Sequence, residues 1–220
     1  MKALLWDLDD TLLETLPGRM RALEHAYEFC LGTRTDALAL WRSHRGGTLE
    51  ALGRRLLGDG FGRFTTAYRE HYYAQQRDIR AFAGIEAVLT ELAGSGVQMA
   101  VVTSKVSWGA IDELGQAGIL PHFAAVVGYD DTELHKPDPA PIFSALERLV
   151  VDDAADAVFV GDSPADVWAA RNAGALSVGA LWGTLDEELL RDAMPDRLAV
   201  SPADLLSLLA ANAHGGMAWK

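Results

Sequence analysis

The segment that decides the fold lies at the start of the chain, where the apolar run Ala3-Leu-Leu-Trp6 is followed at once by Asp7-Leu-Asp9-Asp-Thr11. A short apolar run that ends in acids is typical of a buried parallel strand leading into a polar site. Four further apolar runs, each followed by an amphipathic stretch, repeat this alternation of strand and helix. We expect strands near residues 3–6, 98–103, 124–128, 157–161 and 176–180. The sequence therefore predicts an α/β fold with a Rossmann-like parallel sheet core flanked by helices.

One long segment breaks the alternation. Between Gly18 and Arg80 the sequence has helical periodicity, near residues 20–31, 49–57 and 64–77, and no apolar run typical of a strand. We predict a helical-bundle cap over residues 17–80, inserted after the first strand, and a Rossmann-like core formed by residues 1–16 and 81–220. The core helices are expected near residues 85–94, 108–118, 139–149, 164–173 and 202–211.

Composition and charge limit the classes of partner. The 220 residues are half apolar, enough to bury one core with an insertion, and the net charge of −12 disfavours binding to nucleic acid or to an anionic membrane surface. The charge is uneven: residues 18–80 hold eleven arginines, no lysine and seven acids, so their net charge is +4. The sequence has no apolar run near the roughly 18 residues of a membrane helix and no visible signal peptide, so we expect a cytoplasmic protein. Cys30 is the single cysteine, which excludes an internal disulfide.

The polar residues that follow the apolar runs form one set. Asp7 and Asp9 follow the first run, Thr103 and Ser104 come after the second, and Lys136 follows the third in His-Lys-Pro-Asp-Pro. The fourth run leads into Gly-Asp162-Ser-Pro-Ala-Asp166. In an open parallel sheet the ligand lies outside the carboxyl ends of the strands. We therefore expect these side chains to meet at one edge of the sheet.

Each residue type suits a step of phosphoryl transfer. Asp7 and Asp162 offer the oxygen ligands that Mg²⁺ prefers, and Asp7 can form an acyl-phosphate as nucleophile. Asp9, two residues further, can act as acid toward the leaving oxygen and as base toward water. Lys136 would stabilise charge on the phosphoryl oxygens, and the Thr103 hydroxyl would orient them. The competing interpretation treats the acids as turn or cap residues, which would not require Lys136 and Thr103 at the same edge.

These motifs, in this order, resemble those of the haloacid dehalogenase-like hydrolase superfamily, in the branch with a helical cap after the first strand. The matching elements are Asp7-Leu-Asp9-Asp-Thr11, Val-Val-Thr103, Lys136-Pro-Asp-Pro and Gly161-Asp162-Ser-Pro-Ala-Asp166. The resemblance covers nearly the whole chain. It implies that Asp7 is the nucleophile, Asp9 the acid/base, and Thr103 and Lys136 the phosphate contacts. It also implies a Mg²⁺ ion bound by Asp7, by the backbone carbonyl of Asp9 and by Asp162. Asp166 would mainly support these ligands instead of binding the ion directly.

Within the superfamily the chain is most similar to phosphoglycolate phosphatases and related hydrolases of small esters or pyrophosphate. It departs from many of them in having Thr103-Ser104-Lys105 where Thr-Asn-Lys is common. Ser104 is a candidate substrate contact, and Lys105 is either a ligand contact or a solvated loop lysine. Arg45, in a cap loop beside Gly46-Gly47, is the first candidate for substrate binding from the cap.

We therefore expect a Mg²⁺-dependent phosphatase of small soluble phosphate monoesters, working as a monomer or weak homodimer. Asp9 argues against dehalogenation, because the dehalogenases of this superfamily lack an acid at that position. Two alternatives stay open. One is a sugar phosphomutase with the same motifs, and the other is a phosphate-binding or regulatory module without turnover. The cap loops that would select the substrate contain no recognisable motif.

Overall fold

The computed structural model describes residues 1–44, 48–75 and 79–213, and contacts between Cα atoms divide the chain into two compact units. One unit comprises Met1–Glu14 and Arg80–Lys220, and the other comprises Thr15–Ile79. The second unit contains the segment for which the sequence predicts a helical cap. Its action as a substrate lid stays a prediction. Among the described residues, no helix is both long and apolar enough to cross a membrane.

The larger unit contains a six-stranded sheet in the order β3-β2-β1-β4-β5-β6, and all five pairings are parallel. The strands are β1 (Ala3–Trp6), β2 (Gln98–Val102), β3 (Ala125–Val127), β4 (Ala157–Gly161), β5 (Leu176–Ala180) and β6 (Arg197–Ala199). This arrangement confirms the predicted α/β class. The first five strands lie where the sequence predicts them, whereas β6 at the edge of the sheet was not predicted.

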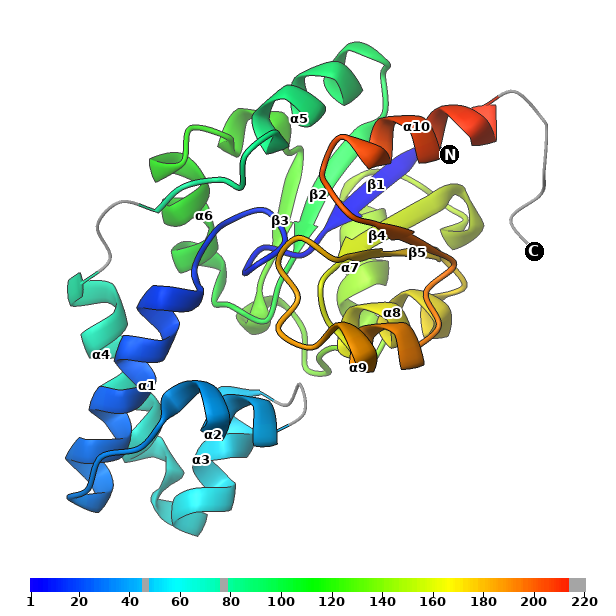
Figure 1. The fold of residues 1–220 in the computed structure, drawn as a ribbon. Helices are drawn as coiled ribbons and strands as arrows, with labels where there is room; N and C mark the ends of the chain where they lie inside the picture. Colours follow the sequence, from blue (N-terminus) through cyan, green and yellow to red (C-terminus); the bar gives the residue numbers. More distant parts are fainter. Residues whose placement is uncertain (45–47, 76–78, 214–220) are drawn as a thin grey trace. The chain divides into compact units, whose positions relative to one another are not determined.

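Helices cover both faces of this sheet (Figure 1). They are α5 (Ile85–Gly94), α6 (Ser107–Gln116), α7 (Ala140–Arg148), α8 (Pro164–Ala173), α9 (Glu187–Asp192) and α10 (Asp204–Ala213). Strand residues such as Leu5, Val102 and Phe159 form one buried cluster with Ile142 of α7 and Ala169 of α8. Figure 1 shows α5 and α10 together on the opposite face, where they also contact each other. The short helix α9 was not predicted.

The register of the central strands brings the polar motifs to one level. Trp6 at the end of β1 pairs with Val101 of β2 and with Val160 of β4. Asp7 continues the ladder by donating its backbone N–H to the Val160 carbonyl at 2.9 Å. Because neighbouring parallel strands end together, the residues that follow them share the same edge.

The chain passes between the two units at two points, and the segments of the larger unit next to these points pair with each other. Leu13 and Ala81 form an antiparallel bridge, the Phe82 N–H donates to the Leu12 carbonyl at 3.0 Å, and the Glu14 N–H donates to the Arg80 carbonyl at 3.0 Å. These hydrogen bonds tie the outgoing and returning chain together immediately beside the loop that carries Asp7 and Asp9.

In its described part the smaller unit contains α-helices and no strand; the helices are α1 (Leu16–Leu31), α2 (Ala37–Ser43), α3 (Leu49–Leu57) and α4 (Phe61–Gln75). Its core contains Leu23, Leu52 and Phe64, and the partly buried Cys30 packs against it, as expected of a small apolar side chain. Helix α2, which spans only two turns, was not predicted. The described residues also form single turns of 3₁₀ helix, at Gly58–Gly60 in this unit and at Leu120–His122, Tyr129–Asp131 and Ala154–Asp156 in the larger unit.

Candidate active site

The loop after β1 is held in a tight turn that fixes the directions of Asp7 and Asp9. Asp10 occupies the left-handed region with φ of 63°, and its N–H donates to the Leu13 carbonyl at 2.8 Å. Asp10 is therefore a turn residue. The indole N–H of Trp182 donates to the Thr11 carbonyl at 2.8 Å. A Cβ on Gly183 would lie 1.6 Å from the Asp10 carbonyl oxygen, so only glycine allows this close approach.

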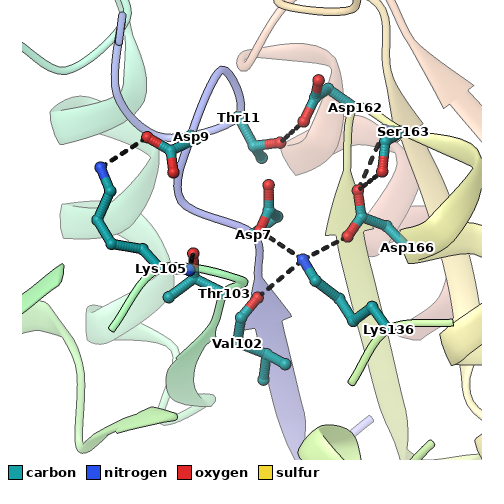
Figure 2. A network of polar contacts seen from close by, with 10 residues as sticks. All are labelled: Asp7, Asp9, Thr11, Val102, Thr103, Lys105, Lys136, Asp162, Ser163 and Asp166. Atoms are coloured by element: carbon teal, nitrogen blue, oxygen red, sulfur yellow. Dashed lines mark hydrogen bonds and ion pairs between the residues drawn. The ribbon is translucent and has the colours of Figure 1, made fainter. Parts of the chain in front are cut away.

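Lys136 lies at the centre of the site and joins two motifs that are far apart in sequence. Its side chain is 5% exposed, and Nζ donates to Asp7 Oδ1 and to Asp166 Oδ1, both at 2.6 Å (Figure 2). The Val102 carbonyl at the end of β2 lies 3.3 Å from the same nitrogen. Burial opposes the charged form, but the carboxylates of Asp166 and Asp7 raise the pKa of Lys136 above its ordinary value. Lys136 therefore carries its charge at neutral pH.

Three carboxylates converge beside this lysine. One oxygen each of Asp7, Asp162 and Asp166 can be chosen so that all lie within 4.8 Å of one another. Burial, and then the charge of nearby Asp166, raise the pKa of Asp7 to about 7 despite the opposing effect of Lys136. Burial, followed by the charges of Asp7 and Asp166, also raises the pKa of Asp162 well above its ordinary value. The three carboxylates, when ionised, therefore carry more negative charge than Lys136 neutralises.

Asp162 and Asp166 have different neighbours. Asp162 is partly buried and accepts a hydrogen bond from the Thr11 hydroxyl at 3.0 Å, which links the first and fourth motifs. Asp166 is buried and closes a capping box at the start of α8, where its Oδ2 accepts from Ser163 N at 3.1 Å and Ser163 Oγ at 2.6 Å. A Cβ on Gly161 would lie 2.4 Å from Asp166 Cβ and Cγ. Asp166 thus caps the helix and also belongs to the acidic cluster.

Asp9 faces a second buried lysine. Lys105 Nζ donates to Asp9 Oδ1 at 2.8 Å and also pairs with Glu113 of α6 (Asp9 and Lys105 in Figure 2). The Lys105 side chain is only 8% exposed, so its interpretation as a solvated loop lysine is wrong. Glu113 was not singled out from the sequence. The available signal was its spacing, since the helical repeat places it on the same face as the buried Ala110 and Leu114.

The remaining predicted residues differ in their surroundings. Thr103 is buried, and its hydroxyl oxygen accepts from the Lys105 N–H at 3.1 Å while its own N–H donates to the Val127 carbonyl. Ser104, beside it, is exposed. Arg45 lies outside the described residues. The structure therefore brings Thr103 to the sheet edge that carries Asp7.

The donor set fits a hard divalent cation. The three clustered carboxylates supply the oxygen ligands that Mg²⁺ prefers. Burial, and then repulsion from neighbouring carboxylates, raises the pKa of Asp7 and of Asp162, and a bound cation would favour the ionised form of both. Asp7 and Asp162 are predicted ligands, and Asp166 is the third member of the cluster. The side chain of Asp9 pairs with Lys105, and the resemblance predicts that the Asp9 backbone carbonyl contacts the metal.

Comparison with known proteins defines the family. The family model described as haloacid dehalogenase-like hydrolase matches residues 4–180, which include every motif described above, and the chain belongs to this family. The chain is 33% identical over 210 residues to a protein of Caldanaerobacter subterraneus subsp. tengcongensis named "Putative pyrophosphatase PpaX", with 94% of each chain covered.

Two further similarities bear on the same point. The chain is 32% identical over 217 residues to a phosphoglycolate phosphatase of Pectobacterium atrosepticum, covering 95% of this chain and 92% of the relative. The crystal structure of a predicted phosphoglycolate phosphatase from Haemophilus somnus 129PT superposes with a TM-score of 0.84 at 24% identity, covering 95% of this chain and 98% of the other. At that identity the superposition supports the fold alone. The predicted superfamily is confirmed.

Proposed function

We propose that the protein is a Mg²⁺-dependent phosphatase of small phosphate monoesters that forms an aspartyl-phosphate on Asp7. The observation that carries the proposal is the pairing of Asp7 with Lys136 at 2.6 Å inside an acidic cluster, with Asp9 two residues further along the same turn. A buried ammonium beside a nucleophile can stabilise charge on a transferring phosphoryl group. An acid at the position of Asp9 suits a leaving oxygen that needs a proton.

The proposed reaction has two steps. In the first, an oxygen of Asp7 attacks phosphorus, the bond from phosphorus to the ester oxygen breaks, and Asp9 gives a proton to the departing alcohol. In the second, water attacks the same phosphorus, Asp9 accepts a proton from it, and the bond to Asp7 breaks to release inorganic phosphate. Lys136 stays charged throughout and lies against Asp7, while the Thr103 hydroxyl orients the phosphoryl oxygens.

The metal would be held by the carboxylates of Asp7 and Asp162 and the backbone carbonyl of Asp9, with Asp166 supporting the cluster. When bound, Mg²⁺ would neutralise negative charge and polarise the phosphoryl group as a Lewis acid. The buried position of Asp7 alone favours its protonated form, which cannot act as a nucleophile. Lys136 opposes this effect by favouring the ionised carboxylate.

We infer the substrate class from the names of two relatives and from the excess of arginine in the smaller unit. The names of two relatives, a pyrophosphatase and a phosphoglycolate phosphatase, indicate small, strongly anionic substrates. We propose that the unit Thr15–Ile79 acts as a lid whose excess of arginine attracts such an anion. Arg45 is the first residue to test, and replacing it without any change in KM would count against the lid contact.

The test is release of inorganic phosphate from a panel containing phosphoglycolate, pyrophosphate, sugar phosphates and nucleotides, with Mg²⁺ at neutral pH. Asp7→Asn and Asp9→Asn serve as comparison variants. Turnover by the wild type that both substitutions and a chelator abolish is the expected result. A folded, Mg²⁺-binding wild type that releases phosphate from no ester would overturn the proposal.

The same panel addresses the two alternatives. A phosphomutase would interconvert sugar-phosphate isomers without releasing phosphate in proportion, so both products are followed in parallel. A silent binding module would bind a phosphate ester tightly in calorimetry and give no product. The presence of Asp9 favours an enzyme, because a module that only binds phosphate gains little from an additional carboxylate at its site.

A further inference from the structure

Glu113 is a buried acid that the reaction above leaves without a role. Its side chain is 0% exposed, and it lies on α6 between Asp112, which is exposed, and Leu114, which is buried. A carboxylate removed from water is costly unless an opposite charge and hydrogen bonds compensate it. Its partner is Lys105, and an aliphatic residue would fill the same helix position without that cost. The carboxylate therefore calls for an explanation beyond packing.

Lys105 connects this buried acid to the reactive loop. Its ammonium pairs with Glu113 on one side and donates to Asp9 Oδ1 at 2.8 Å on the other. Its backbone N–H donates to the Thr103 hydroxyl oxygen at 3.1 Å, so a hydrogen bond also fixes the main chain at this residue. A lysine side chain has a flexible four-carbon stem, and one ion pair alone leaves that stem several conformations. The second pair, to a rigid helix, fixes where the ammonium lies.

We propose that Glu113, acting through Lys105, is a positioning residue for Asp9. This inference rests on the proposed function, in which Asp9 gives the leaving oxygen its proton. Glu113 anchors the ammonium, and the ammonium directs the Asp9 carboxylate. Glu113 also shares the charge of Lys105, so Asp9 is oriented without being locked into an exclusive pair with one cation. Removing Glu113 takes away one of the two ion pairs that hold the Lys105 ammonium beside Asp9.

The expected signature is a dependence on the leaving group. An alkyl phosphate needs a proton on its departing oxygen, whereas p-nitrophenyl phosphate releases a stable anion without one. The ratio kcat/KM reports the steps up to departure of the leaving group. We expect Glu113→Gln to lower kcat/KM for an alkyl phosphate by about tenfold to a hundredfold, a part of the total effect of general acid catalysis. For p-nitrophenyl phosphate, kcat/KM of the variant should stay within about threefold of the wild-type value, because hydrolysis of that ester needs little general acid catalysis.

The controls come from the same helix and the same pair. Asp112→Asn removes a negative charge from the neighbouring exposed position and should leave both substrates unchanged. Lys105→Met should reproduce the selective loss. The double variant Lys105→Met with Glu113→Leu replaces the ion pair with apolar side chains, an exchange that proteins often tolerate. It should fold and still show the selective loss, because Asp9 has no anchored ammonium.

The outcomes separate the two proposals. A folded Glu113→Gln protein that loses activity equally on both substrates, or on neither, overturns the positioning role. If that variant does not fold, the double variant is the test. A double variant whose kcat/KM for the alkyl phosphate equals that of the wild type overturns the inference. A wild type that releases phosphate from no ester of the panel overturns the proposed function and this inference with it. Wild-type turnover with a selective loss in the variants supports both.

Discussion

Replacing Lys136 by methionine tests whether the buried ammonium stabilises the core as well as the reaction. The side chain is 5% exposed and makes two ion pairs of 2.6 Å. Hydrogen bonds to charged groups contribute about 1.5–3 kcal/mol each, and removing one partner of a buried ion pair costs about 3–5 kcal/mol. Protonation of Asp7, whose pKa is already about 7, limits the loss. We therefore expect Lys136→Met to lower the free energy of unfolding by about 3–5 kcal/mol at pH 8, where Asp7 is ionised in the wild type.

Urea unfolding in a chelator, followed by tryptophan fluorescence, measures this change. Lys2→Met is the matched control, since Lys2 pairs with Asp156 at 2.7 Å but its side chain is 69% exposed. A surface pair contributes little, so this variant should unfold like the wild type. At pH 5 the loss in Lys136→Met should shrink, because Asp7 then takes up a proton. A Lys136→Met protein as stable as the Lys2→Met protein at pH 8 would refute the reasoning.

Three further predictions address metal binding, the turn at Asp10 and the hydrogen bonds that Asp131 accepts. Burial raises the pKa of Asp7 to about 7, so between its unfolded value of 3.8 and about 7 the folded state holds a proton that the unfolded state has released, and stability without metal falls as pH rises. Mg²⁺ should therefore raise Tm more at pH 8 than at pH 5, and equal shifts would contradict this. Gly183→Ala places a Cβ 1.6 Å from the Asp10 carbonyl oxygen, so kcat should fall by about 10²-fold with the turn displaced, as steady-state kinetics would show. Burial alone would raise the pKa of Asp131, but the hydrogen bonds it accepts, first from Ser107, lower it. This contribution is present above pH 3.8 and is lost as pH falls through the folded pKa, so Asp131→Asn should cost about 1 kcal/mol in urea unfolding at pH 7 and progressively less as the pH falls below 3.8.

The sequence predicts the sheet because its buried parallel strands consist mainly of apolar residues. The four-residue strand β1 and the five-residue strands β4 and β5 were located to the residue. The edge strand β6 has only three residues and includes Arg197, so it carries no apolar run that could be recognised. The helices α2 and α9, of seven and six residues, are too short to show a helical period.

The candidate site was predictable in its location and less so in its pairings. Motifs at strand ends placed Asp7, Lys136 and Asp162 at one edge, since strand order does not alter which edge the carboxyl ends share. Which acid each lysine contacts depends on side-chain geometry at sequence separations of 96 for Asp9 and Lys105 and 129 for Asp7 and Lys136. No sequence pattern encodes those distances.

The charges of the site explain why a cation and an arginine-rich segment belong to the same proposal. Two networks hold five carboxylates against two ammonium groups. The carboxylates belong to Asp7, Asp9, Glu113, Asp162 and Asp166, and the ammonium groups to Lys105 and Lys136. With all five ionised, this excess of negative charge would repel a phosphate monoester, which is itself an anion. Protonation of the buried acids lowers the repulsion but removes the nucleophile. A divalent cation lowers it and keeps Asp7 ionised, so we expect metal and substrate to bind cooperatively.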